Sequence, residues 1–258
     1  MLSRSFTSSS TISSMSPISR RRFLALSAAT LAARHIAFGA DPMPAIPTDL
    51  DHILLGINDL DHGIAWLEQR SGVRASFGGV HPGRGTRNAL LSLGPRCYLE
   101  IIAPDPAQLG QSSPTQKNAL WMKLQKIKEP RLVGWAVHTD DLASLARKVV
   151  AAGLDIKQPR DGSRSRPDGK LLRWRSFSLK QDRGGLLPFF IEWSPESIHP
   201  SQDAPSGCVI QSFAIESWVD DVIKSTVRKL GIDADSRSGK KALLRASITG
   251  KNGAFELT

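Results

Sequence analysis

The residues most able to do chemistry lie in a glycine-rich stretch from Gly78 to Pro106. Four polar side chains stand on its loop: His81, Arg84, Thr86 and Asn88. The loop runs into a short apolar segment that contains one carboxylate, Glu100. A carboxylate buried in a strand is costly unless a partner stabilises it. His52, which lies 48 residues upstream in a second apolar segment, is the obvious candidate partner.

The loop itself has the composition of a site for an anion or a carbonyl group. Arg84 could hold a carboxylate or a phosphate through two parallel hydrogen bonds. Thr86 and Asn88 add neutral hydrogen-bonding groups. The same residues could instead only shape a turn, because Gly83 and Gly85 favour loop geometry. Both interpretations remain open at this stage.

The elements that must position these groups form a repeated pattern. A strand at His52, a helix with an aspartate at its start and about three further strands make the first copy. A second copy starts at Gly134, and a shorter third copy follows Pro205. Repetition of one supersecondary unit is stronger evidence than any single predicted element.

Strand alternation predicts where the polar groups point. Successive side chains face opposite sides of a strand, so His52 and Glu100 each share a face with alternate neighbours. Glu192 shares its face with Phe190. We expect each strand to bury one apolar face under helices and to offer one polar group on the other. His52, Glu100 and Glu192 would then converge inside a cupped sheet.

Composition limits the classes of function. The chain has 258 residues, 40% of them hydrophobic, which suffices for one or two domains with a real core. Its formal net charge is +10, but residues 1–39 hold five arginines and no acidic residue. The remaining 29 basic and 24 acidic residues are spread along the chain. Without a basic stripe interleaved with aromatic residues, we expect no nucleic-acid partner.

Residues 1–40 are typical of a targeting segment. The run Ser19–Ala25 matches the twin-arginine export pattern, and a moderately apolar run, Phe23–Ala33, overlaps and follows it. That run is too short to span a bilayer. Small residues place a cleavage site near Gly39 or Ala40. We expect a periplasmic or secreted protein without a membrane anchor after cleavage; the alternative is an amphipathic or tail-like N-terminus.

Only two cysteines, Cys97 and Cys208, are present. They form no metal-binding motif and are too few for a disulfide framework. An oxidising compartment would permit a bridge between them, but Cys97 is better explained as a small apolar packing residue.

These motifs together resemble the vicinal oxygen chelate superfamily, and within it the glyoxalase-like domain proteins, over about residues 49–200. The resemblance rests on these segments: Leu50–His52, Asn58–Leu60, Gly79–Asn88, Tyr98–Pro106, Gly134–Trp135, Arg166–Gly169 and Pro188–Trp193. It implies an α+β fold in which paired βαβββ modules, about 49–106 and 131–195, form a cupped mixed sheet around a divalent metal. Residues 206–258 would be a shorter, βαββ-like C-terminal extension.

The resemblance also implies the metal ligands. In that superfamily they come from the first and last strands of each module, which here are His52, Glu100, Gly134 and Glu192. Gly134 departs from the pattern because glycine offers no ligand. Three protein ligands and a water would still make an open catalytic site, suited to Zn²⁺, Mn²⁺, Fe²⁺ or Ni²⁺. His81 is a second candidate for the fourth position.

Each of these residues also has a structural explanation. His52 could be a hydrogen-bonded core histidine. Glu100 and Glu192 could pair with arginines such as Arg87 or Arg173 across the cup, which is compatible with a binding site that holds no metal.

The basic run from Arg164 to Arg175 is typical of a solvated hairpin. Trp174 within that run is the aromatic residue best placed to line the cup and contact a substrate. His62 and His199 have the surroundings of surface residues.

Two functional hypotheses follow. The first is a metal-dependent lyase or isomerase, in which the metal polarises two adjacent oxygens of a small substrate and Glu192 or Glu100 moves a proton. His81 and Arg84 would orient that substrate. The second is a non-catalytic module that binds a small anionic or aromatic compound in the same cup. Either protein would be a monomer or a homodimer, with the C-terminal extension packed on a sheet edge or replacing a dimer contact.

Overall fold

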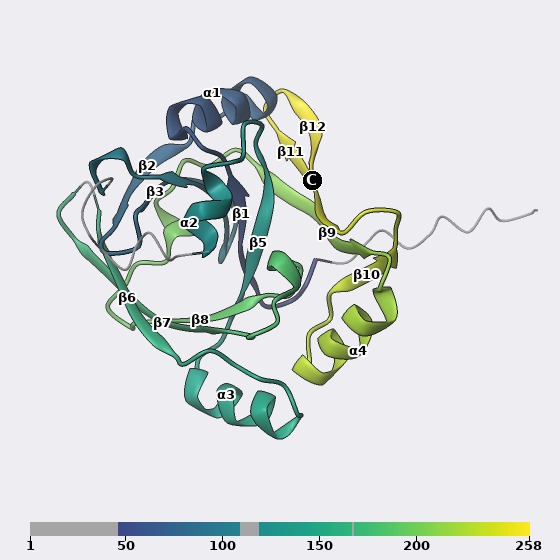
Figure 1. The fold of residues 1–258 in the computed structure, drawn as a ribbon. Helices are drawn as coiled ribbons and strands as arrows, with labels where there is room; N and C mark the ends of the chain where they lie inside the picture. Colours follow the sequence, from purple (N-terminus) through teal and green to yellow (C-terminus); the bar gives the residue numbers. More distant parts are fainter. Residues whose placement is uncertain (1–45, 109–118, 167) are drawn as a thin grey trace, which may run out of the picture. The chain divides into compact units, whose positions relative to one another are not determined.

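The computed structural model describes residues 46–108, 119–166 and 168–258. The predicted export segment and its cleavage site lie outside these residues. Within them, two βαβββ modules build one eight-stranded mixed sheet, which confirms the predicted fold class (Figure 1). No helix in the described part of the chain is long and apolar enough to cross a membrane.

The two modules repeat the same order of elements. The first consists of β1 (Leu50–Gly56), α1 (Leu60–Ser71), β2 (Ser76–His81), β3 (Thr86–Gly94) and β4 (Cys97–Pro104). The second consists of β5 (Arg131–His138), α3 (Leu142–Ala151), β6 (Arg160–Ser165), β7 (Leu171–Ser178) and β8 (Phe189–Trp193). The short helix α2 (Ala119–Leu124) lies between the modules in the chain.

Sheet topology brings the first and last strands of the modules together at the centre. The strand order is β2-β3-β4-β1-β5-β8-β7-β6. β1 runs parallel to β4 and β5 runs parallel to β8, while β1 and β5 pair in antiparallel register. The four strands that the resemblance associates with ligands are therefore neighbours.

Local signals explain where the helices begin and end. Asp59 caps α1 by accepting a hydrogen bond from the backbone N–H of His62, and Gly72 ends that helix with a φ of 70°. Asp141 caps α3 in the same way through the N–H of Ser144. An aspartate cap and a glycine in the left-handed region are the expected chemistry of helix ends.

The C-terminal segment forms a second sheet. Its elements are β9 (Val209–Ser217), α4 (Asp220–Leu230), β10 (Asp235–Ser238), β11 (Leu243–Gly250) and β12 (Gly253–Leu257). The strand order, β10-β9-β11-β12, differs from that of the modules, because β10 pairs with β9 rather than with β11. The segment thus has one strand more than expected and a topology of its own.

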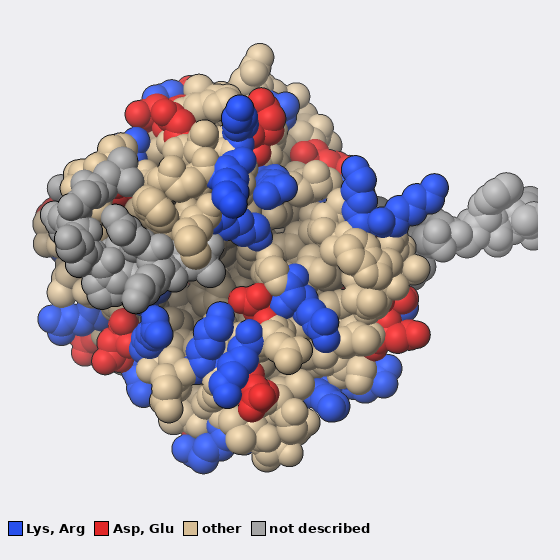
Figure 2. All heavy atoms as spheres, viewed as in Figure 1, with Lys and Arg blue, Asp and Glu red and all other residues tan. Residues whose placement is uncertain are grey.

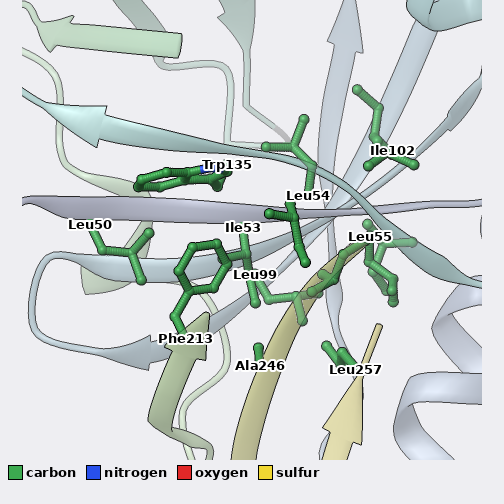
Figure 3. Close-up of a cluster of buried hydrophobic side chains, with 14 of the residues drawn as sticks. Leu50, Ile53, Leu54, Leu55, Leu99, Ile102, Trp135, Phe213, Ala246 and Leu257 are labelled. Atoms are coloured by element: carbon green, nitrogen blue, oxygen red, sulfur yellow. The ribbon is translucent and has the colours of Figure 1, made fainter. Parts of the chain in front are cut away.

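This second sheet packs on the large sheet through a shared hydrophobic core. Figure 3 shows Phe213 and Ala246 facing side chains of the central strands, including Ile53 and Leu99. The rings of Phe213 and Trp135 lie 5.0 Å apart. The face of β1 and β5 that carries Trp135 is therefore buried, and the opposite face of the large sheet forms the cup.

Charged side chains are dispersed over the surface. On the face shown in Figure 2, lysine and arginine side chains stand in several separate groups, with acidic residues close to them. Cys97 and Cys208 are both free and buried, so they pack as apolar residues and do not pair.

Candidate functional site

The cup is centred on Glu100, which is buried on β4. One carboxylate oxygen, Oε2, lies 3.6 Å from His52 Nε2 on β1. The other, Oε1, accepts a hydrogen bond of 2.7 Å from the side-chain amide of Asn88 on β3 and lies 3.7 Å from His81 Nε2. The structure therefore brings three of the other predicted site residues together around the Glu100 carboxylate.

A second carboxylate, Asp51, supports His52 from behind. The Nδ1 atom of His52 lies 2.5 Å from Asp51 Oδ1. Neighbouring residues of a strand normally face opposite sides, but the pairing of β1 with β5 shifts register between Leu50 and His52. Such a bulge redirects a side chain. It accounts for the position of Asp51 beside the imidazole that follows it.

Asp51 is fully buried and has further partners. Trp193 Nε1 donates a hydrogen bond of 2.9 Å to its Oδ2 atom, and His199 Nε2 lies 3.2 Å from the same oxygen. His138 Nδ1 lies at 3.5 Å, too far for a firm hydrogen bond. Burial by itself would raise the pKa of Asp51, but the interactions with His138, His199 and His52 outweigh it and hold the pKa well below its usual range.

His81 stands at the end of β2 with a defined tautomer. Its Nδ1 atom lies 2.9 Å from Thr86 Oγ1, and its Nε2 atom lies 3.4 Å from the amide nitrogen of Asn88. An amide N–H can only donate, so Nε2 accepts and Nδ1 carries the proton. Burial lowers the pKa of His81 to about 4, against the opposing effect of Glu100. His81 is therefore neutral at physiological pH.

The walls of the cup are aromatic. Trp174 on β7 is buried and meets His81 edge to face, with ring centroids 6.2 Å apart. It also packs against Trp193 at 5.6 Å. Tyr98 stacks on His52 with centroids 4.5 Å apart. Trp174 thus lines the cup as expected, while Arg84 is half-buried in the turn between β2 and β3.

The segment between β8 and β9 covers part of the cup. Its short 3-10 helix, η4 (Pro200–Gln202), packs on β3 and β4. Ser92 on β3 binds this segment twice, through its N–H to Pro205 O and through its hydroxyl to Ser201 O. The same segment places His199 beside Asp51. The expectation that His199 lies on the surface is corrected, because its segment folds back across the sheet.

Glu192 is not brought to this cluster, which corrects the expected convergence of three ligands. Its Oε2 atom accepts a hydrogen bond of 3.0 Å from the N–H of Leu142 and so caps α3. Phe190, on the same face, packs in the core beneath that helix. The other face of β8, with Ile191 and Trp193, points into the cup. Side chains alternate along β8 as expected, but the face that carries the carboxylate is not the face of the cup.

Arg164 is a cup residue that the sequence pattern places in a solvated hairpin. Only 4% of its surface is exposed. Its Nη1 atom donates a hydrogen bond to the carbonyl oxygen of Gly78 on β2. The large sheet curls until its edge strands β2 and β6 approach each other, which buries the arginine. The sequence of this one strand, Arg160–Ser165, gives no signal of such an approach.

A pocket of about 510 Å³ lies along β6, β7 and β8. Its lining includes Asp161, Arg175 and Glu192, which are paired with one another across the three strands. Arg175 is exposed, and its guanidinium lies 3.5 Å from the Asp161 carboxylate. The pocket shares Trp174 and Trp193 with the wall of the cup. Because none of the buried polar groups around Glu100 lines this pocket, we place the chemistry in the cup.

Comparison with known proteins agrees with this fold. A family model described as "Glyoxalase-like domain" matches residues 50–228. A hypothetical protein from Staphylococcus aureus is similar in structure, with a TM-score of 0.57, 18% identity and coverage of 81% of this chain and 84% of that chain. Methylmalonyl-CoA epimerase from Mycobacterium tuberculosis has a TM-score of 0.43, 22% identity and coverage of 59% and 92%. No curated protein matches the chain.

Proposed function

This chain belongs to the glyoxalase-like domain family, and we propose that it is a lyase- or isomerase-type enzyme that moves a proton on a small oxygenated substrate. The observation that carries the proposal is the buried pair of His52 and Glu100, whose Nε2 and Oε2 atoms lie 3.6 Å apart. Both groups are more than nine-tenths buried, and both face the cup.

The surroundings of the pair favour one proton on it. Asp51 accepts from His52 Nδ1, so a neutral imidazole would turn its Nε2 lone pair toward the carboxylate. Two acceptors in contact inside a buried site are unfavourable. One proton on Nε2 or on Glu100 removes this repulsion. A histidine and a carboxylate that carry one proton between them can act as general acid and general base.

The roles of the individual residues follow from this geometry. Glu100 takes a proton from a carbon next to a carbonyl or carboxyl group, and protonated His52 faces the oxygen on which negative charge develops. Asp51 stabilises that imidazolium, as a buried carboxylate does behind a catalytic histidine. Asn88 orients Glu100 through its hydrogen bond to Oε1. Trp174 forms a wall of the site.

The described residues do not fit the divalent metal centre that the fold family implies. Of the four corresponding strand positions, only His52 and Glu100 offer a ligand atom to the cup; Gly134 has none, and Glu192 caps α3. Among residues 46–108, 119–166 and 168–258, no three histidine, cysteine or acidic side chains are grouped to hold a metal ion. We therefore derive no step through a metal.

Solvent exchange tests this proposal even before a product is identified. The protein is incubated in D₂O with a panel of small ketones and 2-substituted carboxylic acids, and deuterium at carbon is followed by NMR. We expect incorporation into at least one compound. His52→Asn keeps a donor near Asp51 but removes Nε2, and should slow exchange by about 100-fold or more. Undiminished exchange in His52→Asn would contradict the assigned roles.

The non-catalytic binding module is the alternative, and Gly134 favours it. This residue stands where a relative would carry a ligand, and no atom of the described residues lies within 4 Å of the position that a Cβ would occupy. The exchange experiment separates the two functions. A binding module would retain a compound in the cup without exchanging any of its hydrogens.

A further inference from the structure

Arg164 is a buried cation that the proton chemistry does not use. It stands on β6, with 4% of its surface exposed. Among the described residues, no carboxylate forms an ion pair with its guanidinium within 4.0 Å. Its one side-chain hydrogen bond there goes to the Gly78 carbonyl oxygen. A guanidinium has five N–H donors in a planar fork, and this bond uses a single one.

A second unsatisfied group borders the same glycine. The Oδ1 atom of Asn88 is buried and has no hydrogen-bond partner among the described residues. A Cβ added to Gly78 would lie 2.4 Å from that oxygen. Arg164 and the Asn88 oxygen therefore both border this one residue. Among the described residues, the first is a cation with no carboxylate in ion-pair contact, and the second is an acceptor with no donor.

Burial of either group without a partner is energetically unfavourable. A buried charge is unfavourable unless an opposite charge and hydrogen bonds compensate it. Buried polar atoms are almost always hydrogen-bonded. If Arg164 only joined β2 to β6, a neutral donor would bind the Gly78 carbonyl at a lower cost. A ligand that carries an anion and a donor would satisfy both groups at once.

We propose that Arg164 binds the carboxylate of the substrate, and that the substrate is a small carboxylic acid monoanion with a hydroxyl or similar donor for Asn88. The inference rests on the proposed function, because Asn88 also holds Glu100 and so places the bound acid beside the base. The planar fork of arginine matches a carboxylate in two parallel bonds. The nearby charge of Glu100 disfavours a dianion such as phosphate.

Calorimetric titration of the full chain with matched probes tests this inference. Lactate and mandelate are compared with their neutral amides, lactamide and mandelamide, and inorganic phosphate is titrated separately. We expect at least one acid to bind about tenfold or more tightly than its amide, and phosphate to bind more weakly than that acid. Equal binding of acid and amide, no binding of either acid, or tighter binding of phosphate would overturn the proposal.

Variants locate the preference at Arg164. Arg164→Gln should abolish the preference for acid over amide, and Arg164→Lys, which keeps the charge but not the fork, should weaken it. Arg175→Gln is the control, because Arg175 is exposed on the opposite face of the sheet. Circular dichroism checks folding. If Arg164→Gln does not fold, an undiminished preference in Arg164→Lys overturns the assignment.

Failure of this inference is distinct from failure of the proposed enzyme. Binding needs no turnover, so a Glu100→Gln variant should retain the acid preference while it loses proton exchange. If exchange is absent but the acid preference follows Arg164, the site binds carboxylates and the enzyme proposal fails. If Arg164→Gln exchanges carboxylic acids as fast as the wild-type protein does, the enzyme proposal stands and Arg164 has no part in recognition.

Discussion

At the residue scale, the cup concentrates charge and imidazole groups that the sequence scatters. His52 and Glu100 could be predicted to meet, because the resemblance assigns them to the first and last strands of one module, which both contribute to the cup. Asp51 could not be assigned to the site, because strand alternation turns it away from His52 and only the bulge opposite Ala136 brings it back. Bulges depend on the pairing of two strands and leave no reliable local signal.

His81 gives a prediction on pH dependence. Burial lowers its pKa from 6.5 to about 4, so the unfolded chain binds a proton before the folded protein does. The free energy of unfolding is therefore unaffected by His81 above pH 6.5, and it falls as the pH drops from 6.5 toward 4. Titration of this one imidazole should lower the free energy of unfolding by roughly 3 kcal/mol in all.

Urea unfolding of the wild-type protein and of His81→Gln at several pH values measures this effect. The stability of the variant relative to wild type should rise as the pH falls through this window. His138, whose pKa is raised by Asp51, changes stability in the opposite direction in both proteins and cancels in the difference. A difference that is constant from about pH 7 to pH 4 would show that His81 titrates normally.

At the element scale, the sequence predicts where the helices that frame the site begin and in what order the strands follow. The caps Asp59 and Asp141 fix the starts of α1 and α3, and the repeated order of elements predicts a symmetric sheet. The predicted face of β8 is wrong, because both faces of this strand carry large apolar residues. On such a strand, alternation alone does not reveal which face lies under a helix.

Two buried glycines on neighbouring strands give a matched prediction. At Gly134 on β5 an added Cβ would meet no atom of the described part of the chain within 4 Å, whereas at Gly56 on β1 it would lie 2.6 Å from Val133 Cγ1. Glycine in a strand interior is costly for entropic reasons. Gly134→Ala should therefore raise the free energy of unfolding by about 0.5–1 kcal/mol. Gly56→Ala should lower it by about 1–3 kcal/mol through overpacking.

Thermal and urea unfolding of the two variants compare these effects. If Gly134→Ala destabilises the protein as much as Gly56→Ala does, the open space beside Gly134 is not present in solution. This open space matters for function, because Gly134 occupies one of the four strand positions that the resemblance associates with ligands.

At the scale of the whole molecule, the second sheet supports the back of the cup. The strands that carry His52 and Gly134 rest on Phe213, Ala246 and their neighbours (Figure 3). This support was not predictable, because the C-terminal segment resembles a third module in sequence and instead adopts another strand order. The sequence predicts all but one of the elements of this segment. The pairing of its strands depends on the surface on which they pack.

Phe213 tests how far the two sheets depend on each other. It is fully buried against Trp135, so Phe213→Ala should lower the free energy of unfolding by about 3–5 kcal/mol. Trp218, which is 66% exposed, is the control, and Trp218→Ala should change stability by no more than about 0.5 kcal/mol. Tryptophan fluorescence and backbone circular dichroism should report one common transition. Separate transitions would show that the sheets unfold independently.

The central claim is that the chemistry of the cup depends on Glu100 and not on Glu192, and the most direct measurement compares these two carboxylates. Glu100→Gln and Glu192→Gln are assayed for deuterium incorporation from D₂O into the same compound. Glutamine at position 192 can still cap α3, so that variant should exchange within about twofold of wild type. Glu100→Gln should be slower by about 100-fold or more. Equal losses in both variants, or loss only in Glu192→Gln, would contradict this assignment.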